Sequence, residues 1–137
     1  MEIAFEKQIV LVTGAARGVG QALCTAFCRR GAQVHASDIL EPELESLNQS
    51  IQCDRGGSIQ IHPADITDEA KVAGLIKEIQ EFNAGRSLDI VVCAAGGIVG
   101  QQAKPIDEVT QTDWLGIIDV NITGVFNVIK AVVPGMK

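Results

Sequence analysis

Three glycines that follow a short apolar run are the residues of this sequence that most directly indicate chemistry. Residues 9–12 read Ile-Val-Leu-Val, which is too short for a helix and typical of a strand buried on both faces of a parallel sheet. Gly14, Gly18 and Gly20 then allow the backbone to turn tightly and to approach a bulky ligand. A helix that begins at about Gly18 would direct its unpaired N–H groups and positive dipole end at that ligand, which suits a pyrophosphate. The alternative is an ordinary strand-to-helix turn, because glycine patterns also occur by chance.

An acidic residue follows at the end of the next expected strand. Asp38 comes directly after residues 33–37, where a carboxylate can hold the hydroxyls of an adenosine ribose. Between the two strands, residues 21–30 carry apolar side chains at helical spacing, and Gly31 is a natural helix stop. Strand, glycine turn, helix and second strand therefore predict one βαβ unit that binds a dinucleotide.

The segment from Thr13 to Gly20 resembles the T-G-x-x-x-G-x-G cofactor motif of the short-chain dehydrogenases/reductases, position for position. The resemblance covers essentially the whole chain. It implies an NAD(P)-dependent oxidoreductase that acts on an alcohol or carbonyl substrate and assembles as a homo-oligomer. Together, the spacing and the resemblance indicate these cofactor-binding residues: Thr13, Gly14, Arg17, Gly18, Val19, Gly20, Asp38, Asp65, Ile66, Ala94 and Gly96.

Asp65 and Ile66 are expected at the adenine. They follow an alternating strand, residues 58–62, expected at the sheet edge, and precede a helix over residues 69–83 capped by Thr67 or Asp68. In the resembled family an aspartate at this position contacts the adenine amino group, and Ile66 would flank the ring. The alternative for Asp65 is a loop carboxylate with local hydrogen bonds.

The fourth expected strand, residues 88–93, leads into Ala94-Ala95-Gly96-Gly97. The family pattern here is N-N-A-G, and this chain has Cys93 and Ala94 in place of the two asparagines. Side-chain hydrogen bonds from those positions are lost. Small residues would still let the backbone lie under the adenosine ribose.

A long final helix is expected from a cap at Thr112 or Asp113 through at least Val133. It is apolar around most of its circumference, which predicts burial on more than one side. Asn121 matches the family's N-x-x-G pattern, in which the asparagine carries a water into the proton relay, and is the catalytic candidate. The alternative is that Asn121 bonds only a backbone carbonyl.

The expected fold class is α/β, a doubly wound parallel sheet of Rossmann type with strand order 3-2-1-4, incomplete on the strand-5 side. Residues 1–137 would form one dinucleotide-binding domain, the N-terminal part of a longer domain. The resembled family donates its proton from a tyrosine helped by a lysine four residues on and a serine, and this sequence contains no tyrosine.

Two interpretations of the missing tyrosine stay open. The first is the cofactor-binding half of an NAD-dependent oxidoreductase, truncated and inactive alone. The second is a non-catalytic nucleotide-binding or interaction module, completed by another chain.

The predicted cofactor is NAD(H) rather than NADP(H). The charge of Asp38 would repel a 2′-phosphate, and its oxygens would accept from a free 2′-hydroxyl. Arg17 favours NADP, because in some members of the resembled family a basic residue just before the second glycine does so. Asp38 has more weight because its contact with the 2′-hydroxyl would be direct.

Composition excludes several other classes. A net charge of −6 and a pI near 4.8 argue against a non-specific nucleic-acid binder. The N-terminus does not resemble a signal peptide, and no uninterrupted apolar run approaches about 18 residues, so a cytoplasmic protein without a membrane span is expected. No metal site is expected, and His35 and His62 are expected to be structural. The cysteines are expected as free thiols: Cys24, Cys28, Cys53 and Cys93.

Overall fold

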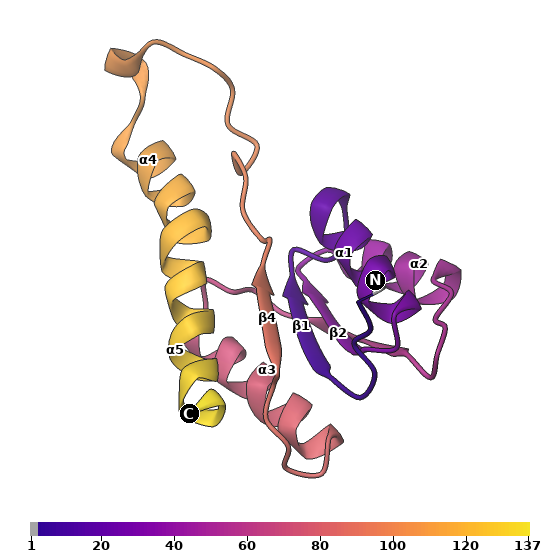
Figure 1. Ribbon diagram of the computed structural model, residues 1–137. Coiled ribbons are helices and arrows are strands. Elements are labelled where there is room, and N and C mark those ends of the chain that lie inside the picture. The colour runs from indigo at the N-terminus through magenta and orange to yellow at the C-terminus, as the bar shows by residue number, and fades with distance from the viewer. Residues whose placement is uncertain (1–2) are drawn as a thin grey trace.

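The structure, a computed structural model, describes residues 3–137, which form a parallel sheet of four strands between two layers of helices (Figure 1). The strands lie in the order β3-β2-β1-β4, and each neighbouring pair is parallel. Their bounds are β1 (Ile9–Thr13), β2 (Gln33–Asp38), β3 (Ser58–Pro63) and β4 (Ile90–Cys93). The predicted fold class and strand order are confirmed.

Helices cover both faces of the sheet. The first face carries α1 (Gly18–Arg29) and α2 (Glu41–Ser50), and the opposite face carries α3 (Glu69–Phe82) and α5 (Gly124–Met136), as Figure 1 shows. The segment between β4 and α5 extends away from the sheet. It contains a 3₁₀ turn η1 (Ile106–Glu108), helix α4 (Gln111–Ile118) and a π-helical segment η2 (Asp119–Thr123).

The central strand β1 is buried on both faces, as its apolar sequence predicts. Val10 and Val12 belong to the core under α1 and α2, whereas Ile9 and Leu11 belong to the core under α3 and α5. Each of these side chains is 0% exposed, and burial of such a side chain is worth about 1.5–3 kcal/mol. The carboxyl end of β1, where the glycines follow, is therefore firmly anchored.

The last helix begins earlier than the sequence predicts. Its cap is Thr110, not Thr112 or Asp113: Thr110 Oγ1 accepts from the Asp113 backbone N–H at 3.1 Å, and Asp113 Oδ2 accepts from the Thr110 N–H at 3.0 Å. This reciprocal pair is a capping box, which requires the acidic residue at the third helical position. Asp113 therefore completes the cap instead of starting the helix.

Among residues 3–137 this helix is buried on one side only, so its expected burial on a second side stays a prediction. Val128 and Val132 pack into the core with α3, but nothing among residues 3–137 covers the other side. The exposed apolar side, defined here as the outer face of α4–α5, consists of Trp114, Leu115, Ile122, Phe126 and Ile129, which are 48–59% exposed.

The continuous helical run Gln111–Met136 is relevant to the expectation that the protein has no membrane-spanning helix. Within the described residues it is the one helix long and apolar enough to cross a membrane by length and composition. Apolar core helices of soluble proteins meet the same criterion. The exclusion of a membrane span thus stays a prediction.

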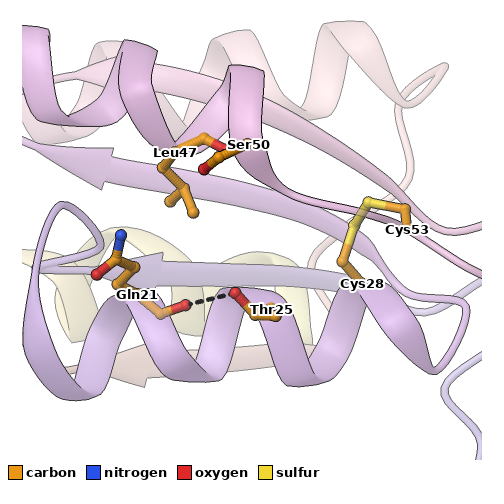
Figure 2. The surroundings of a disulfide bond; sticks show 6 residues. All are labelled: Gln21, Thr25, Cys28, Leu47, Ser50 and Cys53. Carbon is orange, nitrogen blue, oxygen red and sulfur yellow. Dashed lines mark hydrogen bonds between the residues drawn. A yellow bond between two sulfur atoms is a disulfide. The ribbon is translucent and has the colours of Figure 1, made fainter.

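The expectation of four free thiols is wrong for two of the cysteines. Cys28 and Cys53 form a disulfide, with Cα atoms 4.7 Å apart (Figure 2). It joins the last turn of α1 to the segment before β3, where the Asp54 N–H also donates to the Cys28 carbonyl at 3.3 Å. Because disulfides form mainly in oxidising compartments, the cytoplasmic location stays a prediction.

Cys24 and Cys93 are free, as expected. Burial raises the pKa of the Cys24 thiol to about 12 and also raises that of Cys93 above its usual value. Both groups are therefore neutral near pH 7, and neither is an activated nucleophile.

Candidate functional site

The turn after β1 depends on glycine at two positions. Gly14 has φ +68°, and a Cβ there would lie 2.5 Å from the Ala95 backbone nitrogen. At Gly20 a Cβ would lie 2.0 Å from the Gly14 carbonyl oxygen. Neither position accepts a side chain without movement of the backbone, so the close return of α1 onto the turn requires both glycines.

The N-terminus of α1 is left without a side-chain cap. Helix α1 begins at Gly18, as predicted, and its N-cap residue Arg17 makes no capping hydrogen bond. The first turn, which includes Val19 and Gly20, contains no acidic residue. Because the first N–H groups of a helix have no partner within it, this end is suited to an anion.

A cavity of about 360 Å³ opens at the carboxyl ends of the strands. It lies beside the end of β1, between β2 and β4, where ligands bind in open α/β sheets. Its volume is in the usual range for a small-molecule site. The lining residues are Gly14, Arg17, Ser37, Asp38, Ile39, Leu40, Ala64, Asp65, Ile66, Ala94, Ala95, Gly96 and Val120.

The cavity brings together most of the residues predicted from the sequence. Those that line it are Gly14, Arg17, Asp38, Asp65, Ile66, Ala94 and Gly96. Thr13 ends β1, and Gly18, Val19 and Gly20 form the first turn of α1. All four lie outside the lining, as does Asn121.

Asp38 connects the end of β2 to the glycine turn. Its Oδ2 accepts from the Ala16 N–H at 3.0 Å, and its Oδ1 accepts from the Leu40 N–H at 3.1 Å. A carboxylate has about four acceptor positions, so these two bonds leave capacity for ligand hydroxyls. Asp38 therefore both braces the turn and borders the cavity.

Arg17 is directed toward α2. Its Nη2 donates to Glu43 Oε1, and the Arg17 and Glu43 side chains are 68% and 32% exposed. The hydrogen bond from Arg17 lowers the pKa of Glu43, so this carboxylate stays charged near pH 7. Sequence analysis missed Glu43, since an acidic residue in the first turn of a helix is common without any partner.

Asp65 makes local hydrogen bonds, as the alternative interpretation of this residue predicts. Its Oδ1 accepts from the Thr67 N–H at 2.9 Å and from Thr67 Oγ1 at 2.7 Å. These bonds lower the pKa of Asp65, which keeps it charged at the cavity wall. Next to it, Ile66 is 7% exposed and packs closely on Gly124 of α5.

Asn121 joins the π-helical segment to the loop after β4. Its Nδ2 donates to the Ile117 and Gly97 carbonyls, both at 2.8 Å, and its Oδ1 accepts from the Gly97 N–H at 3.0 Å. A Cβ on Gly96 would lie 2.7 Å from Asn121 Oδ1, so glycine is required at Gly96 for this contact. Bonding to a backbone carbonyl, the alternative interpretation, is thus present.

The backbone after β4 is held by Thr13. The Ala94 N–H donates to the Thr13 carbonyl at 3.2 Å, and the Ala95 N–H donates to Thr13 Oγ1 at 3.4 Å. This segment therefore keeps its place beside β1 without the two asparagine side chains of the N-N-A-G pattern.

Six lining residues were not predicted from the sequence as site residues: Ser37, Ile39, Leu40, Ala64, Ala95 and Val120. Ile39 and Leu40 directly follow Asp38, so their position next to the acidic residue could have indicated them as lining residues. Ser37 ends in a buried hydroxyl that has no hydrogen-bond partner among the described residues. Val120 reaches the cavity through the π-helical segment, which the sequence pattern does not indicate.

Among residues 3–137, no group of three or more His, Cys, Asp or Glu side chains is arranged to hold a metal ion.

Comparisons with known proteins place the chain among oxidoreductases. A family model described as "short chain dehydrogenase" matches residues 8–137. Oxidoreductase UcpA of Escherichia coli (strain K12) is 40% identical over 126 residues, which are 92% of this chain and 45% of that protein. The 3-oxoacyl-[acyl-carrier-protein] reductase FabG of Thermotoga maritima is 34% identical over 132 residues, 96% of this chain and 51% of that protein.

A solved structure agrees with the sequence matches. A short-chain type dehydrogenase/reductase from Mycobacterium ulcerans superposes with a TM-score of 0.88 at 28% identity, covering 98% of this chain and 48% of that chain. The chain spans about half the length of the curated relatives it matches.

Proposed function

Because the chain belongs to the short-chain dehydrogenase family, we propose that it binds a dinucleotide in the cavity at the carboxyl ends of its strands. In this proposal, residues 1–137 form one dinucleotide-binding domain, the cofactor-binding half of an NAD(P)-dependent oxidoreductase for an alcohol or carbonyl substrate. The observation that carries the proposal is the uncapped N-terminus of α1 beside a cavity that Asp38 borders.

The described residues fit such a cofactor. The N-terminus of α1 offers unpaired N–H groups to a pyrophosphate, and no acidic residue in its first turn opposes the negative charge. The buried Ser37 hydroxyl has no partner within residues 3–137 and lines the cavity. Ala94 and Gly96 provide a wall of small residues against which an adenosine can lie.

Three residues have distinct roles in the proposal. Asp38 accepts from the ribose hydroxyls while it continues to brace the glycine turn through Ala16. Asp65, which stays charged, accepts from the adenine amino group, and Ile66 flanks the ring.

NAD(H) is preferred to NADP(H) in this proposal. Asp38 carries a negative charge at the ribose end of the cavity, where a 2′-phosphate would be repelled. Arg17 could attract that phosphate, but its guanidinium is engaged by Glu43.

A bound dinucleotide would supply hydride exchange with the substrate, and the residues of this chain would contribute its binding and orientation. Asn121 holds the Gly97 backbone, and we assign it a place in the proton relay on the basis of the N-x-x-G match. The sequence contains no tyrosine, so the proton donor usual in this family is not among these residues. The second candidate function is a non-catalytic nucleotide-binding or interaction module.

Binding measurements test the proposal directly. NADH is titrated into the purified chain with its fluorescence as the readout, and ADP-ribose and free nicotinamide are added as competitors. ADP-ribose is expected to displace NADH and nicotinamide to have little effect, because the adenosine half provides the contacts. A folded chain that binds neither NADH nor NADPH would contradict the proposal.

A further inference from the structure

We propose that Glu43, in the first turn of α2, is a specificity-determining residue that keeps NADP(H) out of the site by holding the guanidinium of Arg17. This inference rests on the proposed function, and it concerns a residue outside every motif of the sequence. A basic residue at the position of Arg17 favours NADP(H), and the ion pair with Glu43 makes Arg17 compatible with NAD(H).

Geometry supports this role for Glu43. Arg17 directly precedes Gly18 at the start of α1 and lines the cavity together with Asp38. Arg17 nevertheless bonds to Glu43, whereas the Asp38 oxygens accept from the backbone N–H groups of Ala16 and Leu40. The cation at the cavity rim is therefore paired with α2 and not with the carboxylate expected at the ribose.

Charge balance at the rim follows from this pairing. Arg17 contributes one positive charge, and Asp38 and Glu43 contribute two negative charges. A 2′-phosphate would have to compete with Glu43 for Arg17 and would meet a net negative rim. With Glu43 neutral, the guanidinium is free to make charge-assisted bonds to the phosphate.

The substitution Glu43→Gln isolates the charge. It keeps the size of the side chain, and α2 remains anchored by Leu44 and Leu47, which are buried. Glu41→Gln is the matched control, because Glu41 lies in the same helical turn, is exposed and makes no ion pair within residues 3–137. Both variants remove one negative charge from the first turn of α2.

The measurement is the ratio of the NADPH and NADH dissociation constants for the purified chain and each variant. Glu43→Gln is expected to lower this ratio about 3- to 10-fold, the size expected when an exposed ion pair stops competing. Glu41→Gln is expected to leave it within about 2-fold. In an Arg17→Ala background, Glu43→Gln should no longer lower the ratio, because the effect passes through the guanidinium.

The measured ratios distinguish failure of the role proposed for Glu43 from failure of the proposed function. An unchanged ratio in Glu43→Gln, with NADH still bound, overturns this inference and leaves the proposed function intact. An equal shift in Glu41→Gln, or a shift that persists without Arg17, also overturns it, because general charge would then explain the result. Failure of the folded wild-type chain to bind either dinucleotide overturns the proposed function itself and this inference with it.

Discussion

The side-chain amide of Asn127 on α5 donates a hydrogen bond to the backbone carbonyl of Ile66 at 2.9 Å. Asn127 is 5% exposed and Ile66 is 7% exposed, so the bond lies in the core beneath the cavity wall. It connects two segments 61 residues apart in the sequence. The last helix thereby positions the loop that carries Asp65 and Ile66.

Asn127→Ala is expected to lower the free energy of unfolding by about 1–3 kcal/mol, because the buried Ile66 carbonyl loses its partner. Nucleotide affinity should fall as well, since Ile66 lines the cavity. Urea unfolding and NADH titration measure the two effects. Asn48→Ala, at an exposed position on α2, is the control and should change neither. Equal stability of the two variants would contradict the positioning role.

Asp38→Asn is expected to weaken NADH binding about 10-fold and to reduce the preference for NADH over NADPH. The amide has one acceptor oxygen, which cannot serve the Ala16 and Leu40 N–H groups and a ribose hydroxyl equally well. Parallel titrations with both dinucleotides measure the change. Asp107→Asn, at an exposed position in η1, removes the same charge away from the cavity. A similar loss in both variants would exclude a direct role of Asp38.

The Cys28–Cys53 disulfide is expected to stabilise the fold. It closes a loop with a sequence separation of 25, for which chain entropy gives roughly 3 kcal/mol. Cys53→Ser should therefore lower the Tm in thermal unfolding followed by circular dichroism. Reductant should lower the Tm of the wild type and have no further effect on Cys53→Ser. A reductant effect of the same size in both proteins would show that another group is responsible.

Stability is expected to decrease as the pH falls from about 6.5 to about 4. Burial, and then the neighbouring His62, lowers the pKa of His35 to about 4, and burial lowers the pKa of His62 despite Glu78 beside it. The unfolded state then binds more protons than the folded state in this range, so acid favours unfolding, by up to about 1.4 kcal/mol per pH unit for each proton.

Urea unfolding at several pH values measures this dependence. His35 Nδ1 lies 2.8 Å from His62 Nε2, and Asn83 Nδ2 lies 2.9 Å from His35 Nε2. His35→Gln keeps a polar side chain between His62 and Asn83 but removes one titrating imidazole. The free energy of unfolding should therefore change less steeply with pH between 6.5 and 4. An unchanged slope would assign the acid sensitivity to other groups.

The chain alone is expected to show no dehydrogenase activity and to associate with itself. Its sequence has no tyrosine, and the outer face of α4–α5 exposes Trp114, Phe126 and Ile129. β4 also lies at the edge of the sheet, with backbone groups available for pairing. NADH production over a panel of secondary alcohols and light scattering are the measurements. Turnover by a clean monomer would contradict both expectations.

Two variants separate association from folding. Ile129→Lys places a charge on the outer face of α4–α5 and should reduce association in light scattering. Lys77→Arg, on the exposed surface of α3, is the control and should not. Association that is equally strong in both variants would point to the β4 edge as the contact.

The sequence alone was sufficient for the central βαβ unit and the strand order. Residues 9–12 had to be a buried strand because of their apolar run. The turn required Gly14 because of its positive φ, and Gly20 because a Cβ there would meet the nearby Gly14 carbonyl. The order 3-2-1-4 followed because right-handed crossovers leave few arrangements of parallel strands. The grouping of Asp38, Asp65 and Ala94 around one cavity followed as well, since parallel strands end at the same edge.

Only the tertiary structure decided which distant side chains meet. Cys28 bonds with Cys53, Arg17 pairs with Glu43, and Asn127 reaches Ile66, across separations of 25, 26 and 61 residues. The outer face of α4–α5 is exposed because no other element among the described residues packs on it, although its apolar sequence is typical of a buried helix. Periodicity reports which face of an element is apolar. Partners on other elements depend on the angle and distance at which helices return to the sheet, and these are set by packing of the whole core.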